Sequence, residues 1–346
     1  MTKPRQMIYR SKAPLRIGLA GGGTDVSPFC DLYGGAVLNA TINLYARASI
    51  ICDDSSHIVL HAIDRGFRRE YALSEEIIPE KGLELHAGVY NRIVRQFTHQ
   101  PVAMRLETYV DVPPGSGLGT SSALVVAILG AFTEMLSLPL GEYDMAQLAY
   151  EIERQDLRMP GGRQDQYAAT FGGFNFMEFY GDNKVIVNPL RIHQRYLDEL
   201  THDLVLFYTQ TRRDSSRIIE NQAEAIASHH QLRTKATIKL KEQAFMMKEA
   251  LLKGELRRLG EILNFGWEHK KQIADGITNP QIDSIYSTAL QNGAIGGKIS
   301  GAGGGGFMMF YCPENHRYRL AEALKPFGGF VVNYEFTQQG LSTWSF

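Results

Sequence analysis

Two segments in the first third of the chain alternate between apolar and polar side chains. Residues 103–112 (AMRLETYVDV) place Ala, Arg, Glu, Tyr and Asp between Met, Leu, Thr and Val at every second position. Leu15, Ile17 and Leu19 alternate in the same way with Arg16 and with small residues. A period of two is typical of a strand with one buried face. We therefore predict strands at both segments, the earlier one ending at the glycine-rich turn GGGTD (21–25).

Helical spacing follows the strand predicted at 103–112. Residues 123–138 are apolar nearly all round, which is typical of a buried helix, and Pro139 lies just beyond their end. Helical spacing returns over 142–157 and is followed by MPGGRQDQ (159–166), whose proline and glycines predict a loop before 167–171. The intervening segment PPGSGLGTSSAL (113–124) therefore connects a strand to a helix.

The rest of the chain predicts a second unit that contains both helices and strands. We place the boundary near residue 200, which gives an N-terminal domain over 1–200 and a C-terminal domain over 201–346. Neither an internal repeat nor a disordered linker is visible. The predicted elements after the boundary are a strand at 203–208, helices from about 214 to 271, a helix at 281–292, a glycine-rich loop at 296–306, a strand at 307–312, a helix near 315–324 and a strand at 330–336.

Charge and composition narrow the classes of partner. The chain has 36 Lys plus Arg against 37 Asp plus Glu, so no broad basic field is available for nucleic acid or an anionic membrane. Its longest apolar run, residues 123–132, is much shorter than the roughly 20 residues that cross a bilayer. The N-terminus has no apolar signal core, and the three cysteines show no metal-ligand spacing. We expect a cytoplasmic protein with a small-molecule partner, and leave a homodimer open.

The glycine-rich segment 113–122 could bind an anion. A glycine loop that leads into a helix presents free backbone N–H groups and the positive end of the helix dipole. The alternative is an ordinary tight turn in which Thr120 or a neighbouring serine caps the helix. The loop lacks the lysine of a Walker A motif and the spacing of a dinucleotide-binding fingerprint. The GxGxxG at 301–306 precedes a strand rather than a helix, so it does not support dinucleotide binding.

Three motifs in order resemble those of the GHMP kinases. PPGSGLGTSSAL is similar to the central PxxxGLGSSAA motif of that family, APLRIGLAGGGTD (13–25) to its N-terminal motif, and KISGAGGGGF (298–307) to its C-terminal motif. The resemblance implies an α+β, two-domain fold, with an N-terminal domain like the second domain of ribosomal protein S5 and a ferredoxin-like C-terminal domain. It also implies an ATP-dependent kinase that uses Mg²⁺.

The resemblance assigns the ATP and metal residues. Ser121 aligns with the second serine of the family motif and would bind Mg²⁺, although Thr120 and Ser122 could exchange roles with it. The acidic metal ligand would be Glu153, twelve positions before Asp165, with Glu151 and Asp156 as alternatives. The residues implied to wrap the triphosphate are Pro114, Gly115, Ser116, Gly117, Leu118, Gly119, Thr120, Ser121 and Ser122.

Catalytic and sugar-binding residues follow from the same resemblance. Asp165 matches the aspartate that receives the substrate hydroxyl proton, and Arg16 matches the basic residue that bridges it to the transferring phosphoryl group. On residue type alone, Asp165 could instead be the N-cap of a helix starting at Gln166, and Arg16 could be a surface strand residue. The residues implied to line the sugar pocket are Gly22, Gly23, Thr24, Asp25, Gly303 and Gly304.

Within the family, AGGGTD with VSPFCD and GSGLGTSSAL is most similar to the branch that phosphorylates the anomeric hydroxyl of D-glycero-D-manno-heptose 7-phosphate. The two glycines at 22–23 stand where galactokinases have Glu-His, which argues against plain galactose. A kinase for another sugar, such as fucose or galactose, and a non-catalytic regulator with the same fold are the alternatives. A sugar phosphate also requires cations, for which the unranked candidates are Lys12, Arg163, Arg212 and Arg213.

Overall fold

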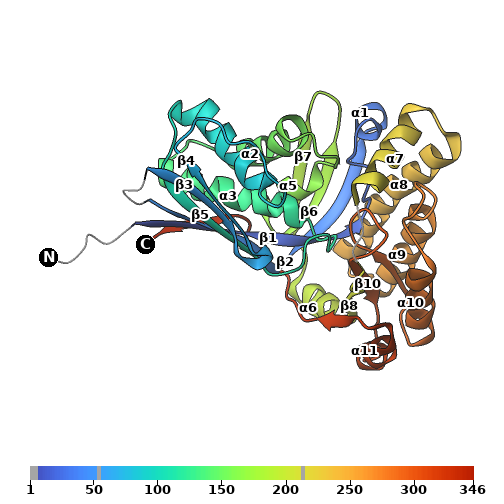
Figure 1. Ribbon diagram of the computed structural model, residues 1–346. Coiled ribbons are helices and arrows are strands. Elements are labelled where there is room, and N and C mark those ends of the chain that lie inside the picture. Colours follow the sequence, from blue (N-terminus) through green and yellow to red (C-terminus); the bar gives the residue numbers. More distant parts are fainter. Residues whose placement is uncertain (1–6, 53–55, 212–214) are drawn as a thin grey trace.

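The computed structural model describes residues 7–52, 56–211 and 215–346 and contains two β-sheets, each covered by helices (Figure 1). The larger sheet has the strand order β12-β1-β2-β5-β3-β4, and β6 branches from β2 and pairs with β7. The long antiparallel pair β1 and β2 forms its centre. The strands of this sheet are β1 (Ile8–Ala20), β2 (Gly35–Ile51), β3 (His57–Ala62), β4 (Phe67–Ala72), β5 (Met104–Val110), β6 (Phe174–Phe179), β7 (Val185–Pro189) and β12 (Ser342–Ser345).

Helix α3 is the central helix of the first lobe, because its apolar surface packs on β1 and β2 and is covered by other helices. The helices of this lobe are α1 (Phe29–Tyr33), α2 (Glu84–Ile93), α3 (Thr120–Leu136), α4 (Glu142–Glu151) and α5 (Gln164–Phe171), with a 3₁₀ turn at Ile63–Arg65 and π-helical turns at Val94–Thr98 and Ile152–Asp156.

The second sheet has the order β11-β8-β10-β9. Helix α9 packs on β9 and β10, whereas α8 contacts both α9 and the long strands β1 and β2, so α8 joins the two lobes. The elements of this lobe are α6 (Gln194–Asp203), β8 (Leu204–Tyr208), α7 (Ser215–Ala227), α8 (Gln231–Lys253), α9 (Leu256–Lys270), α10 (Pro280–Gln291), β9 (Gly296–Ile299), β10 (Phe307–Tyr311), α11 (Arg317–Leu324), a 3₁₀ turn at Lys325–Phe327 and β11 (Phe330–Val332).

The alternation and helical patterns predicted the main elements around the central loop. The strand predicted at 103–112 is β5, with Met104, Leu106 and Thr108 buried, and the helix predicted at 123–138 is α3. The loop predicted at 296–306 was partly wrong, because its first residues form β9 and pair with β10. A Cβ on Gly297 would lie 2.5 Å from the carbonyl oxygen of Met309, so glycine permits this close pairing.

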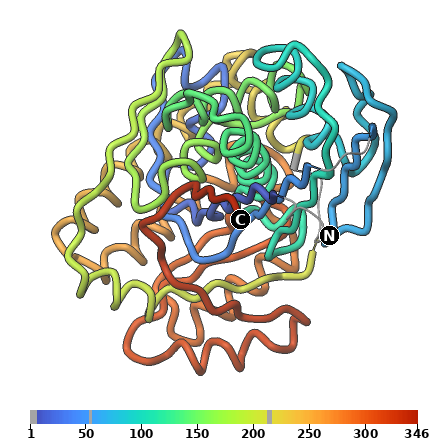
Figure 2. The backbone as a smooth tube through the Cα atoms, turned by 90° about the vertical axis from the view of Figure 1, so that its left-hand side faces the viewer, coloured from blue at the N-terminus to red at the C-terminus, as the bar shows by residue number. Residues whose placement is uncertain are grey.

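The end of the chain returns to the first sheet. The strand predicted at 330–336 is only β11, after which Phe336 makes a single bridge to Ile42. The chain then forms β12, which pairs antiparallel with β1, and the red C-terminal segment lies beside the blue strand in Figure 2. Across the described residues, no helix is both long and apolar enough to span a membrane.

Candidate active site

The glycine loop between β5 and α3 adopts a conformation that favours glycine. Gly115, Gly117 and Gly119 have φ angles of 75°, 80° and 75°, in the left-handed region that other residues rarely adopt. A Cβ on Gly117 would lie 2.5 Å from the carbonyl oxygen of Ser300, so the loop is also closely covered by the second lobe. Helix α3 starts directly after Gly119 and has no side-chain cap. Its first N–H groups are therefore available to an anion.

Arg16 joins the first motif to this loop and to Asp165. Its Nε and Nη2 donate to the two carboxylate oxygens of Asp165 at 2.7 and 2.9 Å, and its Nη1 donates to the carbonyl oxygen of Gly117 at 2.6 Å. The Arg16 side chain is buried, so the alternative of a surface strand residue is wrong. A Cβ on Gly119 would lie 3.2 Å from the carboxylate carbon of Asp165. The carboxylate therefore lies against the N-terminal end of α3.

Asp25 positions the helix that carries Asp165. Its Oδ2 accepts from the backbone N–H groups of Arg163 and Gln164 at 3.0 and 3.1 Å. Its Oδ1 accepts from the Gln164 side-chain amide at 3.1 Å and from the backbone N–H of Gly23 at 3.2 Å. Helix α5 begins at Gln164, so the alternative in which Asp165 is the N-cap of a helix starting at Gln166 is wrong. The carboxylate of Asp25, in the turn that follows β1, therefore holds the first residues of α5, which are far from it in the sequence.

Ser122 and Glu153 form a buried pair at the inner side of the loop. Ser122 Oγ donates to Glu153 Oε2 at 2.7 Å, and Gln166 Nε2 donates to the same oxygen. The other carboxylate oxygen of Glu153, Oε1, forms an ion pair with Arg154 Nη1 at 3.8 Å. Ser121, which the family motif suggested as the metal hydroxyl, is exposed at the mouth of the cleft and has no such contact with Glu153. Of the three consecutive hydroxyl residues, Ser122 is therefore the one directed at the acid.

The alternatives to Glu153 belong to a different cluster. Glu151 and Asp156 both pair with Arg92, at 2.9 and 2.7 Å, and Asp156 also pairs with Arg95. Neither acid lines the motif cleft. They fasten the π-helical turn after α4 to α2.

The three motifs meet at a cleft of ≈ 290 Å³. Thr24 does not line it, because its hydroxyl is held by the carbonyl oxygens of Gly21 and Ala36. Gly303 and Gly304 do not line it either, because they pack against Ile277. Pro114, Ser116 and Leu118 also lie outside it. The predicted site residues that do line it are Arg16, Gly22, Gly23, Asp25, Gly115, Gly117, Gly119, Thr120, Ser121, Ser122, Glu153 and Asp165.

Comparison with known proteins agrees with this arrangement of motifs. The chain matches the family models described as GHMP kinases N terminal domain, over residues 84–173, and GHMP kinases C terminal, over residues 247–328. It is 46% identical over 335 residues to D-glycero-alpha-D-manno-heptose 7-phosphate kinase of Campylobacter jejuni, covering 97% of this chain and 98% of that protein. The chain belongs to the GHMP kinase family.

Solved structures of GHMP kinases share the fold along the whole chain. A D-glycero-D-manno-heptose 1-phosphate kinase from Bacteroides thetaiotaomicron is 44% identical, covers 97% of this chain and 98% of its own, and superposes with a TM-score of 0.82. Lactococcus lactis galactokinase with bound galactose is only 18% identical, with a TM-score of 0.79 over 97% of this chain and 95% of its own. That second likeness concerns the fold alone.

The GHMP motifs did not identify two lysines that also line the cleft. Lys270 ends α9 and Lys298 lies on β9, and both side chains are buried. Burial lowers the pKa of Lys270 to about 8. Burial, together with the neighbouring Lys270 and Arg16, lowers the pKa of Lys298 to about 7. Lys298 belongs to KISGAGGGGF and could have been selected on that basis, whereas Lys270 has no signal beyond its place in an amphipathic helix.

Two of the four cations that the sequence offers for a sugar phosphate lie away from the cleft. Lys12 lies over the ring of Tyr45, and Arg163 pairs with Asp31 at 3.0 Å and donates to a backbone carbonyl. Neither lines the cleft. Arg212 and Arg213 lie outside the described residues.

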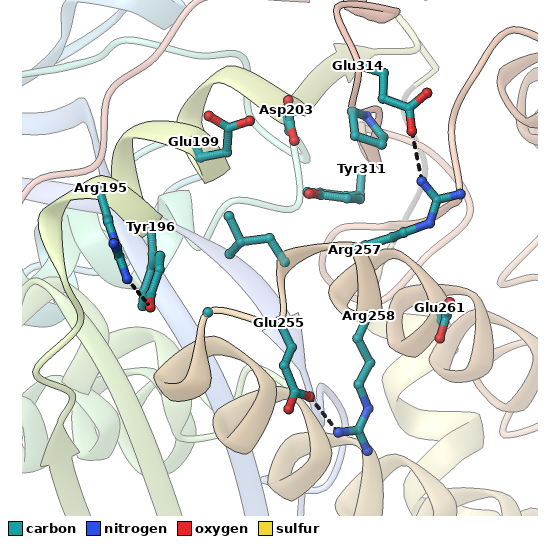
Figure 3. A pocket seen from close by; sticks show the side chains of 13 residues that line it. Arg195, Tyr196, Glu199, Asp203, Glu255, Arg257, Arg258, Glu261, Tyr311 and Glu314 are labelled. Atoms are coloured by element: carbon teal, nitrogen blue, oxygen red, sulfur yellow. Dashed lines mark hydrogen bonds and ion pairs between the residues drawn. The ribbon is translucent and has the colours of Figure 1, made fainter.

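A second, wider groove of ≈ 1000 Å³ lies between α6, the start of α9 and the end of β10 (Figure 3). It shares no lining residue with the motif cleft. Arg257 pairs with Glu314 and Arg258 with Glu255, and Arg195 donates to the Tyr196 hydroxyl.

Proposed function

We propose that this protein is an ATP-dependent sugar kinase that phosphorylates the anomeric C1 hydroxyl of D-glycero-D-manno-heptose 7-phosphate, giving the 1,7-bisphosphate for nucleotide-activated heptose synthesis. The observation that carries the proposal is the bidentate Arg16–Asp165 pair at the N-terminal end of α3. The relatives that are 46% and 44% identical over nearly the whole chain are both named as heptose phosphate kinases, which supports the substrate class.

The residues of the cleft can divide the work of phosphoryl transfer. The N–H groups of the loop and of the first turn of α3 would hold the ATP phosphates. Asp165 would accept the proton of the attacking hydroxyl while that oxygen bonds to the terminal phosphorus and ADP leaves. Arg16 holds the Asp165 carboxylate in place and supplies positive charge beside the transferring group. These roles need positioning rather than a covalent enzyme intermediate.

We also propose that Ser122 and Glu153 hold the Mg²⁺ of the nucleotide complex. Mg²⁺ in nucleotide sites is usually bound through one or two carboxylates together with phosphate oxygens and waters. One carboxylate and one hydroxyl already in contact fit that requirement, and Glu153 is buried beside the loop. When bound, the metal neutralises charge on the phosphates. Ser121, at the mouth, remains near enough in sequence to contact the phosphates from the outer side.

An ADP-release assay against a panel of acceptors tests the function. The panel contains the heptose 7-phosphate, free heptose, galactose, fucose and their phosphates, each with ATP and Mg²⁺ and with EDTA as the metal control. We expect release with the heptose 7-phosphate, abolished by EDTA and restored by Mg²⁺. Release only with a free hexose would identify a kinase for another sugar. Tight ATP binding without release for any acceptor would identify a non-catalytic regulator.

A further inference from the structure

Two buried ammonium groups face the sugar end of the cleft without a carboxylate partner. Lys270 and Lys298 are only 4% and 7% exposed. Lys270 Nζ donates to the carbonyl oxygen of Gly22 at 3.1 Å, and Lys298 Nζ donates to that of Gly18 at 2.9 Å. Among the described residues, neither makes an ion pair within 4.0 Å. Because an ammonium has three N–H donors, each lysine keeps donors to offer a ligand.

Such an arrangement costs folding free energy in the empty protein. A buried charge is normally paired, since burial without a partner is strongly unfavourable. The buried arginines follow that rule: Arg92 has two acids, Arg16 pairs with Asp165 and Arg163 with Asp31. Among the buried lysines and arginines that the structure describes, Lys270 and Lys298 are the exception, and their low pKa values reflect the same cost. An anionic ligand at this place would remove it.

The glycine turn beside the lysines also lines the cleft. A Cβ on Gly22 would lie 3.9 Å from Lys298 Nζ, and one on Gly23 would lie 3.2 Å from Lys270 Nζ. Both ammonium groups therefore face the same side-chain-free turn. Asp25, two residues after Gly23, also lines the cleft, but its carboxylate already accepts from N–H groups of Gly23, Arg163 and Gln164.

The position of the lysines separates them from the point of transfer. Arg16 pairs with Asp165, whereas Lys298 contacts the strand at Gly18 and Lys270 contacts the turn at Gly22. Gly18 lies about 7 Å along β1 from Arg16, and Gly22 lies in the turn beyond the end of that strand, so the two lysines contact backbone progressively farther along the chain from Arg16. The ATP phosphates would instead bind to the loop at 115–122.

We propose that Lys270, Lys298 and the Gly22–Gly23 turn form a subsite for the phosphate group that the acceptor already carries. This inference rests on the proposed function, and it assigns the phosphate end of the acceptor to the second lobe. Two monocations match the charge of a phosphate monoester dianion. A neutral sugar would not remove the cost of burying them.

Lys298→Gln and Lys270→Gln test the subsite, with Lys271→Gln as the matched control because Lys271 is adjacent in sequence and pairs with Glu268 at the surface. With the heptose 7-phosphate, we expect KM to rise about 10–100-fold in each cleft variant, as for loss of a hydrogen bond to a charged group. The KM for ATP should stay within twofold of wild type. The loss of kcat/KM in the cleft variants should be larger with the heptose 7-phosphate than with unphosphorylated heptose.

Two results would overturn the subsite. Equal loss of activity with the phosphorylated and unphosphorylated acceptors, or a raised KM for ATP, would place the lysines at the transferring phosphoryl group. Thermal unfolding of each variant shows whether it is folded. Replacing an unpaired buried charge should leave Tm unchanged or raised. A purely structural role of the lysines predicts a lower Tm in both cleft variants.

A second measurement keeps this inference separate from the proposed function. If the wild type does not use the heptose 7-phosphate, inorganic phosphate is titrated with the loop saturated by a non-hydrolysable ATP analogue and Mg²⁺. A rise in Tm in the wild type and in Lys271→Gln, absent in Lys298→Gln, supports the anion subsite whatever the true acceptor is. The same rise in all three proteins, or in none, overturns it.

Discussion

At the residue scale, the proposed base is the residue whose loss should affect turnover most. Asp165→Asn keeps the shape of the side chain but removes a base and the charge that Arg16 holds in two hydrogen bonds. We expect kcat to fall about 10²–10⁴-fold, the range for loss of general-base catalysis. ATP affinity by calorimetry should change less than threefold. The exposed Asp275→Asn is the control, and a kcat within twofold of wild type for Asp165→Asn would refute the assignment.

Individual residues of the site differ in how far the sequence could predict them. Arg16, Glu153 and Asp165 stand at motif positions, and the structure brings all three to one cleft. The sequence could not select Ser122 over Ser121, because only the phase at which α3 starts decides which hydroxyl faces Glu153. Lys270 could not be selected at all, because a lysine at a helix end is usually solvated and its burial here comes from packing against the other lobe.

At the element scale, periodicity predicted elements that have one buried face and failed for those defined by their partners. The strand β5 and the helix α3 show their periods in the sequence. The strand β9, with the sequence GGKI, has no alternation, and it is a strand because it pairs with β10. The terminal strand β12 is short and polar, and only its pairing with β1 defines it. Local pattern cannot supply the partner.

The start of α5 makes a further prediction at this scale. A Cβ on Gly162 would lie 1.9 Å from Asp25 Oδ2, so Gly162→Ala must displace the carboxylate that holds the first turn of α5. Because α5 carries Asp165, we expect kcat to fall about 10–100-fold, as for a shift of about 1 Å in a catalytic group. Gly181→Ala, where the nearest atom is 3.6 Å away, is the control. Steady-state kinetics that show equal kcat for the two variants would contradict the role of Asp25.

At the scale of the whole molecule, the cleft is completed only where the two lobes meet. Ser300 Oγ donates to the carbonyl oxygen of Gly117 at 2.8 Å, and the backbone N–H of Phe307 donates to that of Ser116 at 2.9 Å. The same C-terminal segment carries Lys298. The first lobe thus provides the glycine loop, Arg16 and Asp165, and the second provides the buried lysines. In the proposed reaction, the relative position of the lobes would therefore determine whether the acceptor is held opposite the ATP phosphates.

The buried lysines also predict how the stability of the ligand-free molecule depends on pH. The pKa of Lys298 is about 7 in the folded protein, lowered by burial and by Lys270 and Arg16, against about 10.5 when unfolded. Between these values the unfolded state binds more protons, so the contribution of Lys298 to stability rises with pH and is lost as pH falls toward 7. The free energy of unfolding rises by about 1 kcal/mol per pH unit through this group. The Lys298→Gln variant has no titrating group at this position. Its Tm should therefore exceed that of the wild type near pH 7, and this excess should shrink by on the order of 1–2 °C per pH unit from pH 7 to 9. Thermal unfolding of both proteins in phosphate-free buffer measures the difference, and a pH-independent Tm difference would mean that Lys298 keeps its charge and has a partner in the folded protein.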